Sequence, residues 1–396
     1  MLALSWPLWA GGDDFPRVPF VRSLPGPSLA ADRAVALVLL SGLVATGLTR
    51  RWKPWYVVSV AALAWLVLND QHRFQPWAYQ YVMTVLFLAA LPRGEGLRYA
   101  RWWFVALYAH SGLSKLDVSF CNELGPVFLK TALGPFGVDP ARWPAAWRNA
   151  AVLAMPIGEL AVAAALAFPK SRRLGRWGAV VLHAGLIGIL SPFGLHHSTI
   201  VLVWNAAVLA EVWTAFGPDL AQESGASVSW RSVPFRLVFW AGVLLPLGER
   251  WGVFDVWPSH ALYASHVERV VVSLHESELS EWPPEIRRHV VEGQGGPWRT
   301  LDLTGWSREV RGTPVYPQNR AGLGLAEALA ARYGGRFVRV VAYGPADRWT
   351  GHRRRVEAIS LGAIRALGDA SLLNAHPAPL RRPPEPLGSQ ASPPNG

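Results

Sequence analysis

The sequence predicts an all-α membrane helical bundle of about eight transmembrane helices, followed by a small α/β C-terminal appendage. Hydrophobic residues make up 51% of the chain and charged residues only 16%, whereas soluble domains carry about 25% charged residues. Apolar runs of nearly membrane-spanning length recur between residues 31 and 257. The chain also holds 21 tryptophans, and tryptophan concentrates at membrane interfaces.

Composition divides the chain into four parts. Residues 1–33 form an N-terminal arm, 34–257 the transmembrane bundle, 260–375 a small α/β extracytoplasmic domain, and 376–396 a disordered Pro/Ser/Gly-rich tail. The apolar start, Met1 to Ala10, is too short to span a membrane and has no basic residues before it. We therefore expect the first long helix to serve as an uncleaved membrane signal.

Hydropathy and periodicity place the individual elements. The candidate spans are 34–49, 55–69, 76–92, 99–115, 150–168, 176–192, 197–216 and 235–256. In the C-terminal part, alternation predicts strands over His266–Leu274 and Phe337–Ala342. Helices are predicted over Pro283–Glu292, Pro317–Tyr333 and Arg353–Leu367.

Loop charge orients the predicted spans. One set of short loops carries twelve lysines and arginines, including Arg231, and the opposite set carries four. The positive-inside rule puts the first set in the cytoplasm and both termini outside. The net charge of +11 fits either an acidic partner or this topology together with anionic lipid. We favour the second explanation, and expect membrane lipid but no nucleic acid as a partner.

Three polar clusters then fall on the predicted outer face. They are Asn69–Trp77 between spans two and three, His110–Asp117 at the end of span four, and His196–Thr199 between spans six and seven. Their convergence predicts a site there. Its ligand-binding candidates are Asp70, His72, Arg73, Gln75, Trp77, His196, His197 and Asn205.

Each cluster also has a simpler explanation. Asp70 and Arg73 could pair with each other in a tight hairpin, and Lys115 could snorkel to the lipid headgroups. The two histidines could be ordinary loop residues. Their location on one face is what favours a shared site.

Lys115, with Asp117 and His110, is the candidate catalytic group. A lysine partly desolvated at a membrane edge can abstract a proton near neutral pH, although a carboxylate such as Asp117 favours the charged lysine. A substrate for this position would come from the bilayer. A quinone or another lipid is therefore the expected ligand.

A second polar set lies inside the spans and consists of Glu159, His183, Asn205 and Glu211. A buried carboxylate must be neutral or paired, so we expect Glu159 to face His183 or Asn205. These residues either form hydrogen bonds that hold the helices together or form a proton path. The histidines lack metal-ligand spacing, so no metal is predicted, and the single cysteine, Cys121, excludes an intramolecular disulfide.

The run Ser111-Gly-Leu-Ser-Lys-Leu-Asp117 resembles the Ala-Gly-Leu-Lys-Lys-Leu-Asp motif of vitamin K-dependent gamma-carboxylases and of their bacterial relatives, the HTTM (horizontally transferred transmembrane) proteins. The resemblance implies a helical membrane bundle with an extracytoplasmic C-terminal part, a reduced quinone as cofactor, and Lys115 as the base. The motif's first lysine is Ser114 here. The Asp70–Trp77 and Ser191–Asn205 stretches look like bacterial membrane proteins of the DoxX/MauE/HTTM type.

These observations lead to two functional hypotheses. In the first, the chain is a multipass protein of the bacterial inner membrane whose outer site binds or acts on a quinone or lipid with Lys115 as base. In the second, the chain is a non-catalytic membrane anchor that presents its C-terminal domain to an extracytoplasmic protein partner. Transport through Glu159 and His183 is a further alternative, without the internal repeat common in transporters.

Overall fold

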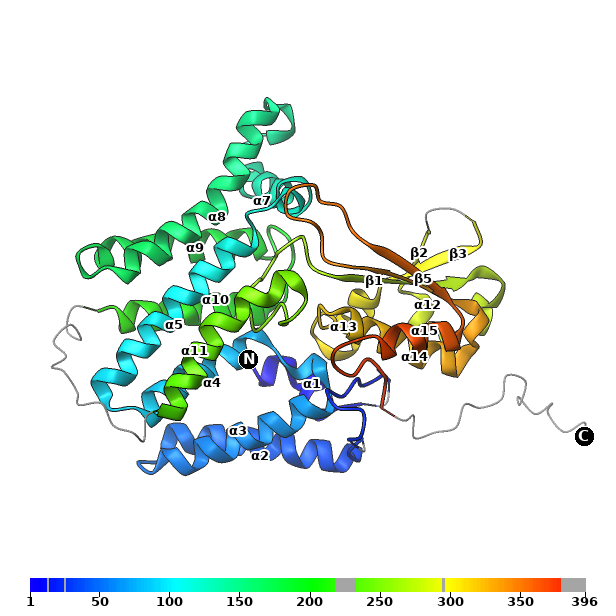
Figure 1. The fold of residues 1–396 in the computed structure, drawn as a ribbon, viewed down its shortest axis with the longest axis horizontal. Helices are drawn as coiled ribbons and strands as arrows, with labels where there is room; N and C mark the ends of the chain where they lie inside the picture. The colour runs from blue at the N-terminus through cyan, green and yellow to red at the C-terminus, as the bar shows by residue number, and fades with distance from the viewer. Residues whose placement is uncertain (13, 25, 218–232, 294–295, 379–396) are drawn as a thin grey trace, which may run out of the picture.

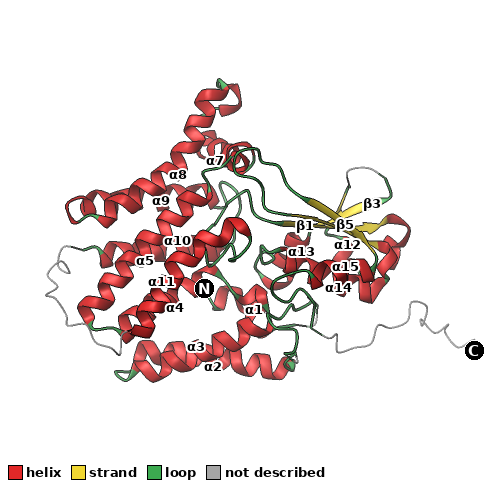
Figure 2. Cartoon of the chain, in the orientation of Figure 1, coloured by secondary structure: helices red, strands yellow, loops and turns green. Residues whose placement is uncertain are grey.

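Helices form most of the structure, and a small antiparallel sheet lies at one end (Figures 1 and 2). The structure is a computed structural model. It describes residues 1–378 except 13, 25, 218–232 and 294–295. The predicted cytoplasmic residue Arg231 and most of the tail predicted to be disordered, 379–396, lie outside the described residues.

Eight helices overlap the eight predicted spans, although the last of them ends at Leu244, well before the predicted end at residue 256. They are α2 (Leu29–Leu48), α3 (Trp52–Asn69), α4 (Pro76–Ala90), α5 (Arg93–Ser114), α8 (Ala145–Ala167), α9 (Arg172–Leu190), α10 (Thr199–Ala215) and α11 (Val233–Leu244). By length and composition, two helices in the described part of the chain, α2 and α8, could cross a membrane, and α10 is a shorter apolar helix. Eight membrane crossings therefore stay a prediction, although the helical bundle itself is present.

Short helices connect the long ones. The arm carries α1 (Trp6–Ala10), while α6 (Val118–Asn122) and α7 (Leu124–Leu133) lie between α5 and α8. The segment that joins α7 to α8 projects away from the body of the protein (Figure 1). α11 continues as a 3-10 helix, Leu245–Trp251.

The C-terminal part contains a five-stranded antiparallel sheet of order β2-β3-β1-β4-β5. Its strands are β1 (Arg269–His275), β2 (Val290–Val291), β3 (Trp298–Leu301), β4 (Val338–Tyr343) and β5 (Arg355–Ile359). The longest helix of this part is α14 (Asn319–Tyr333), and α13 (Leu303–Arg311) precedes it. α14 shares a hydrophobic core with β1 and β4 that includes Leu325, Val272 and Val340.

Two sequence predictions for this part are wrong in detail. Arg353–Leu367 is not one helix, because Arg355–Ile359 pairs with β4 as β5 and only then does α15 (Leu361–Asp369) begin. The predicted helix Pro283–Glu292 is reduced to α12 (Pro284–Arg287), and the strand β2 follows it. In both places pairing with a neighbouring strand overrides local helical tendency.

The N-terminal arm runs between the bundle and the C-terminal domain. Phe15 and Val18 belong to the hydrophobic core of that domain. The backbone N–H of Gln71, in the bundle, donates to the carbonyl of Val18 at 2.9 Å. The last residue that the structure describes returns to the same place, since the N–H of Ala378 donates to the carbonyl of Arg17 at 2.8 Å. Residues 376–378, assigned to the tail from composition, are therefore part of the fold.

Candidate functional site

Lys115 lies at the C-terminal end of α5 and is buried, with 4% of its surface exposed. Its Nζ donates to Glu159 Oε2 at 2.9 Å and Oε1 at 3.1 Å, and to Ser111 Oγ at 2.7 Å. Ser111 precedes Lys115 by four residues, which places both on one face of the helix. Glu159 was expected to pair with His183 or Asn205, but its ion pair is with Lys115.

A close helix contact makes this ion pair possible. A Cβ added to Gly112 of α5 would lie 2.8 Å from the carbonyl oxygen of Pro156 and 2.8 Å from Leu160 Cγ, both in α8. Only glycine fits at that spacing. Pro156 lies three residues before Glu159, so the contact sets Glu159 opposite the last turn of α5.

A hydrogen-bonded chain lies deeper in the bundle. Asn205 Nδ2 donates to the carbonyl of Val201 at 2.8 Å, so its Oδ1 is the acceptor for His183 Nδ1 at 2.9 Å. A neutral His183 then accepts at Nε2 from the hydroxyl of Tyr108, 2.8 Å away. Tyr108 precedes Ser111 by three residues, so Tyr108, Ser111 and Lys115 line one face of α5 over about 10 Å.

The Lys115–Glu159 ion pair and the hydrogen-bonded chain both line a cavity of about 710 Å³ between α5, α8, α9 and α10. Its other walls are mostly apolar, and glycines keep it open. At Gly158 in α8 and Gly185 in α9, an added Cβ would meet nothing within 4 Å. Trp177 and Val181, which also line the cavity from α9, are 53% and 71% exposed. The cavity therefore opens sideways between α8 and α9, on the surface that would face lipid.

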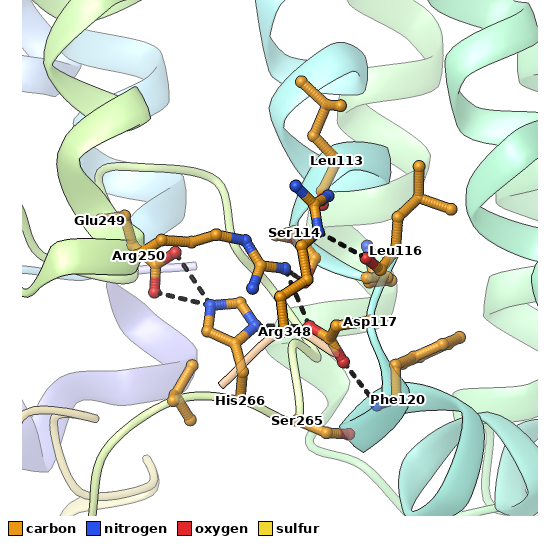
Figure 3. Close-up of polar contacts among 12 residues, drawn as sticks. Leu113, Ser114, Leu116, Asp117, Phe120, Glu249, Arg250, Ser265, His266 and Arg348 are labelled. Carbon is orange, nitrogen blue, oxygen red and sulfur yellow. Dashed lines mark hydrogen bonds and ion pairs between the residues drawn. The ribbon is translucent and has the colours of Figure 1, made fainter. Parts of the chain in front are cut away.

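Asp117 belongs to a different contact, which joins the end of α5 to the C-terminal domain (Figure 3). It caps α6 by accepting from the N–H of Phe120 at 2.7 Å. It also accepts from Arg250 and from His266 Nδ1, both at 2.9 Å. His266 Nε2 donates to Glu249 at 3.0 Å. Since carboxylates only accept, both ring nitrogens of His266 carry a proton.

The charge state of His266 has a clear physical origin. Burial alone would lower the pKa of its imidazole, but hydrogen bonds to Asp117 and Glu249 raise that pKa above its ordinary value. The opposite change occurs at Asp117: burial would raise its pKa, and His266 with the Phe120 N–H lowers it. The group is thus a buried cation between two carboxylates.

The Asp70–Trp77 cluster forms a third, separate group. Asp70 accepts from His72 Nδ1 at 2.9 Å and from Arg311 of α13 at 2.5 Å. Arg73 pairs with Asp32 of α2 at 2.8 Å rather than with Asp70, so the simple hairpin explanation does not hold. These side chains are almost fully buried. They fasten the C-terminal domain to the bundle.

Electrostatics in this third group follow from its burial. Burial would raise the pKa of Asp70, but Arg311 and then His72 hold it well below the usual range. Burial lowers the pKa of His72, so the ring is neutral. Gln75 donates to the carbonyl of His72 at 2.7 Å, and Trp77 packs edge-on against Trp9 of α1.

The remaining candidates are dispersed. His110 points toward α11, where its Nε2 donates to the carbonyl of Val243 at 2.9 Å. His196 is exposed and has a positive φ of 51°. His197 lies at the edge of the cavity, with its ring 5.4 Å from that of Tyr263, which lines the cavity.

The structure thus brings Lys115 together with Glu159, His183 and Asn205 around one cavity. Among the described residues, no hydrogen bond or ion pair joins Lys115 to Asp117, His110 or the Asp70–Trp77 cluster. Nor does any group of three or more His, Cys, Asp or Glu side chains in this part of the chain have the arrangement of a metal site. Glu211 accepts from Gln80 at 2.7 Å, away from the ion pair.

Sequence reasoning gave no role to several residues of these groups. Ser111 and Tyr108 could have been found, because they precede Lys115 by four and seven residues and so share its helix face. Glu249, Arg250 and His266 carry no local pattern that points to Asp117. They lie more than 130 residues away in the sequence, and only the fold brings them together.

The fold and the site define a class of structure, a helical bundle with a buried ion pair in the wall of an internal apolar cavity. Residues 94–197 match the family model of methylamine utilisation protein MauE, a membrane protein family. The match runs from α5 to the loop after α9 and includes Lys115, Glu159 and His183. It supports the MauE part of the resemblance but not the HTTM part. Comparison with curated proteins and with solved structures found no match.

Proposed function

We propose that the chain binds a lipid-soluble, amphipathic molecule in the cavity between α5, α8, α9 and α10. The observation that carries this proposal is a buried Lys115–Glu159 ion pair in the wall of an apolar cavity of about 710 Å³. Ligand sites typically combine an apolar lining with a few well-placed polar groups. The apolar part of the ligand would lie along α8 and α9, and its polar head would bind Lys115 and Ser111.

The ion pair also suggests what chemistry could occur. Lys115 Nζ already donates to the carbonyl and hydroxyl oxygens of Ser111 and to Glu159, so a carbonyl or carboxylate head group would bind it by replacing one of these acceptors. To abstract a proton, Lys115 must first pass one to Glu159, whose carboxylate is 2.9 Å away. A proton-exchanging pair of this kind fits a reduced quinone, the ligand implied by the gamma-carboxylase-like motif.

The proposed setting is a bacterial inner membrane, with both termini on the outer side. The contact between the arm and residues 374–378 supports it, because the arm and the last described residues then lie on one side of the bundle. An even number of membrane crossings would also put both termini on the same side of the membrane. The name of the family that matches residues 94–197 refers to methylamine utilisation.

A second candidate function is that of a membrane anchor for the C-terminal domain. The buried Asp70–Arg311 and Asp117–His266 contacts favour it, because they hold that domain rigidly on the bundle. In that case filling the cavity should be harmless to function.

The test is ligand binding by the full chain in lipid nanodiscs. The probes are menaquinone with one prenyl unit, for a carbonyl head, and oleic acid, for a carboxylate head; tryptophan quenching reports binding, since Trp177 and Trp204 line the cavity. Gly158→Trp should fill the cavity and abolish binding. Gly47→Trp, at an exposed position of α2 with nothing within 4 Å of an added Cβ, is the matched control. Equal binding by both variants would refute the proposal.

A further inference from the structure

One wall of the cavity comes from outside the long helices. Residues 257–266, which we call the strap, connect the end of the bundle to β1, and Leu262 and Tyr263 of the strap line the cavity. Lys115 lines the same cavity. The strap therefore covers the end of the cavity nearest the C-terminal domain.

The backbone of the strap has an unusual conformation. His260 and Tyr263 have positive φ angles of 56° and 60°, which non-glycine residues rarely adopt without support from their surroundings. At Tyr263 the support comes from ring packing against Phe128 of α7 and His197, both at 5.4 Å between centroids. The side chain is thus wedged between α7 and the loop that follows α9.

Both ends of the strap are fixed by charged groups. Beyond one end, Asp255 pairs with Arg320 of α14 and accepts from the hydroxyl of Tyr316 at 2.5 Å. At the other end, His266 is held between Asp117 and Glu249. Arg353 of the C-terminal domain donates to the carbonyl of Ser265. The position of Tyr263 therefore depends on the C-terminal domain.

We propose that Tyr263 is a specificity-determining residue, which closes the aqueous route to Lys115 and leaves the opening between α8 and α9 as the way in. Water-soluble molecules are then excluded, and ligands must arrive from the bilayer. The C-terminal domain holds this gate in place through the strap. The inference rests on the proposed function only for the identity of the ligand, because access to the cavity is measurable without one.

The experiment measures access with thiol reagents in nanodiscs. Cys121 is the chain's single cysteine, so Cys121→Ser with Ser111→Cys places one thiol beside Lys115. A charged sulfonate methanethiosulfonate reports the aqueous route, and apolar N-phenylmaleimide reports the membrane route. Met155→Cys, also in the cavity wall, gives a second background in case the first does not fold.

With Tyr263 intact, the apolar reagent should react and the charged reagent should react slowly. Tyr263→Ala should raise the charged-reagent rate about tenfold, because the rate follows the population of the open state, and should leave the apolar rate unchanged. Tyr263→Phe, which keeps the ring, should behave like the parent, and His266→Gln should behave like Tyr263→Ala.

Two outcomes would overturn the gate. In one, the charged reagent reacts equally fast in the parent and in Tyr263→Ala. In the other, both reagents speed up together, which means that the helices have loosened. Failure of the proposed function looks different: neither the menaquinone probe nor oleic acid would protect the introduced thiol from the apolar reagent, whatever Tyr263 does.

Discussion

Lys115 and Glu159, 44 residues apart, form a buried ion pair across the contact between α5 and α8, with Nζ 2.9 Å from Oε2. Ser111 binds the same ammonium at 2.7 Å. Such a pair does not by itself imply stability, because both groups lose their hydration on burial. The pair lies in the wall of a large apolar cavity. This location favours a binding function over a purely structural one.

Substituting one member of this ion pair should destabilise the protein more than substituting both members. Lys115→Met leaves Glu159 buried without its partner, and we expect a loss of about 3–5 kcal/mol in the free energy of unfolding. Lys115→Met combined with Glu159→Met should recover much of that loss. Thermal unfolding in one detergent compares the three proteins. A double variant no more stable than the single one would show that the two residues do not act as a pair.

The Asp70–Arg311 contact should control attachment of the C-terminal domain. Both side chains are buried, so Arg311→Met leaves the Asp70 carboxylate with only the neutral His72 as its side-chain partner and should cost about 3–5 kcal/mol. Limited proteolysis should then cut between the bundle and the domain. Arg142→Ala is the control, because its ion pair with Asp139 is 87% exposed on the arginine side and should contribute only about 0–1 kcal/mol. Equal protease resistance in the two variants would contradict this assignment.

His266 should make stability depend on pH. The raised pKa of its imidazole in the folded protein means that its stabilisation is fully present below the unfolded value, about 6.5. It is lost as the pH rises through the folded value. The melting temperature should therefore fall as the pH rises from about 6.5 through the folded value, and His266→Gln should flatten the fall. If the parent and His266→Gln lose stability in parallel, the imidazole is not charged between Asp117 and Glu249.

The sequence allowed the long helices to be located, because each contains a long, mostly apolar run. It also allowed β1 and β4 to be located from their alternation. It failed at Arg355–Ile359, where the strand depends on pairing with β4. It also marked Lys115, Glu159, His183 and Asn205 as unusual polar residues. The expected partner of Glu159 was His183 or Asn205, whereas the structure pairs it with Lys115. The assignment of the loop clusters to one membrane face stays a prediction. Arg311, the partner of Asp70, and His266, a partner of Asp117, are far away in the sequence, beyond the reach of local patterns.

The contact at Gly112 predicts opposite effects for two similar substitutions. Gly112→Ala places a methyl group 2.8 Å from the Pro156 carbonyl oxygen. Backbone cannot move aside as a side-chain tip can, so α5 and α8 must separate, at a cost of about 1–3 kcal/mol. The separation also stretches the Lys115–Glu159 pair, so binding of the menaquinone probe should weaken. Gly158→Ala, in the interior of α8 where an added Cβ meets nothing within 4 Å, should instead stabilise the helix by up to about 1 kcal/mol. Melting temperatures that shift in the same direction would show that α5 and α8 do not pack closely at Gly112, and the ion pair would then need another explanation.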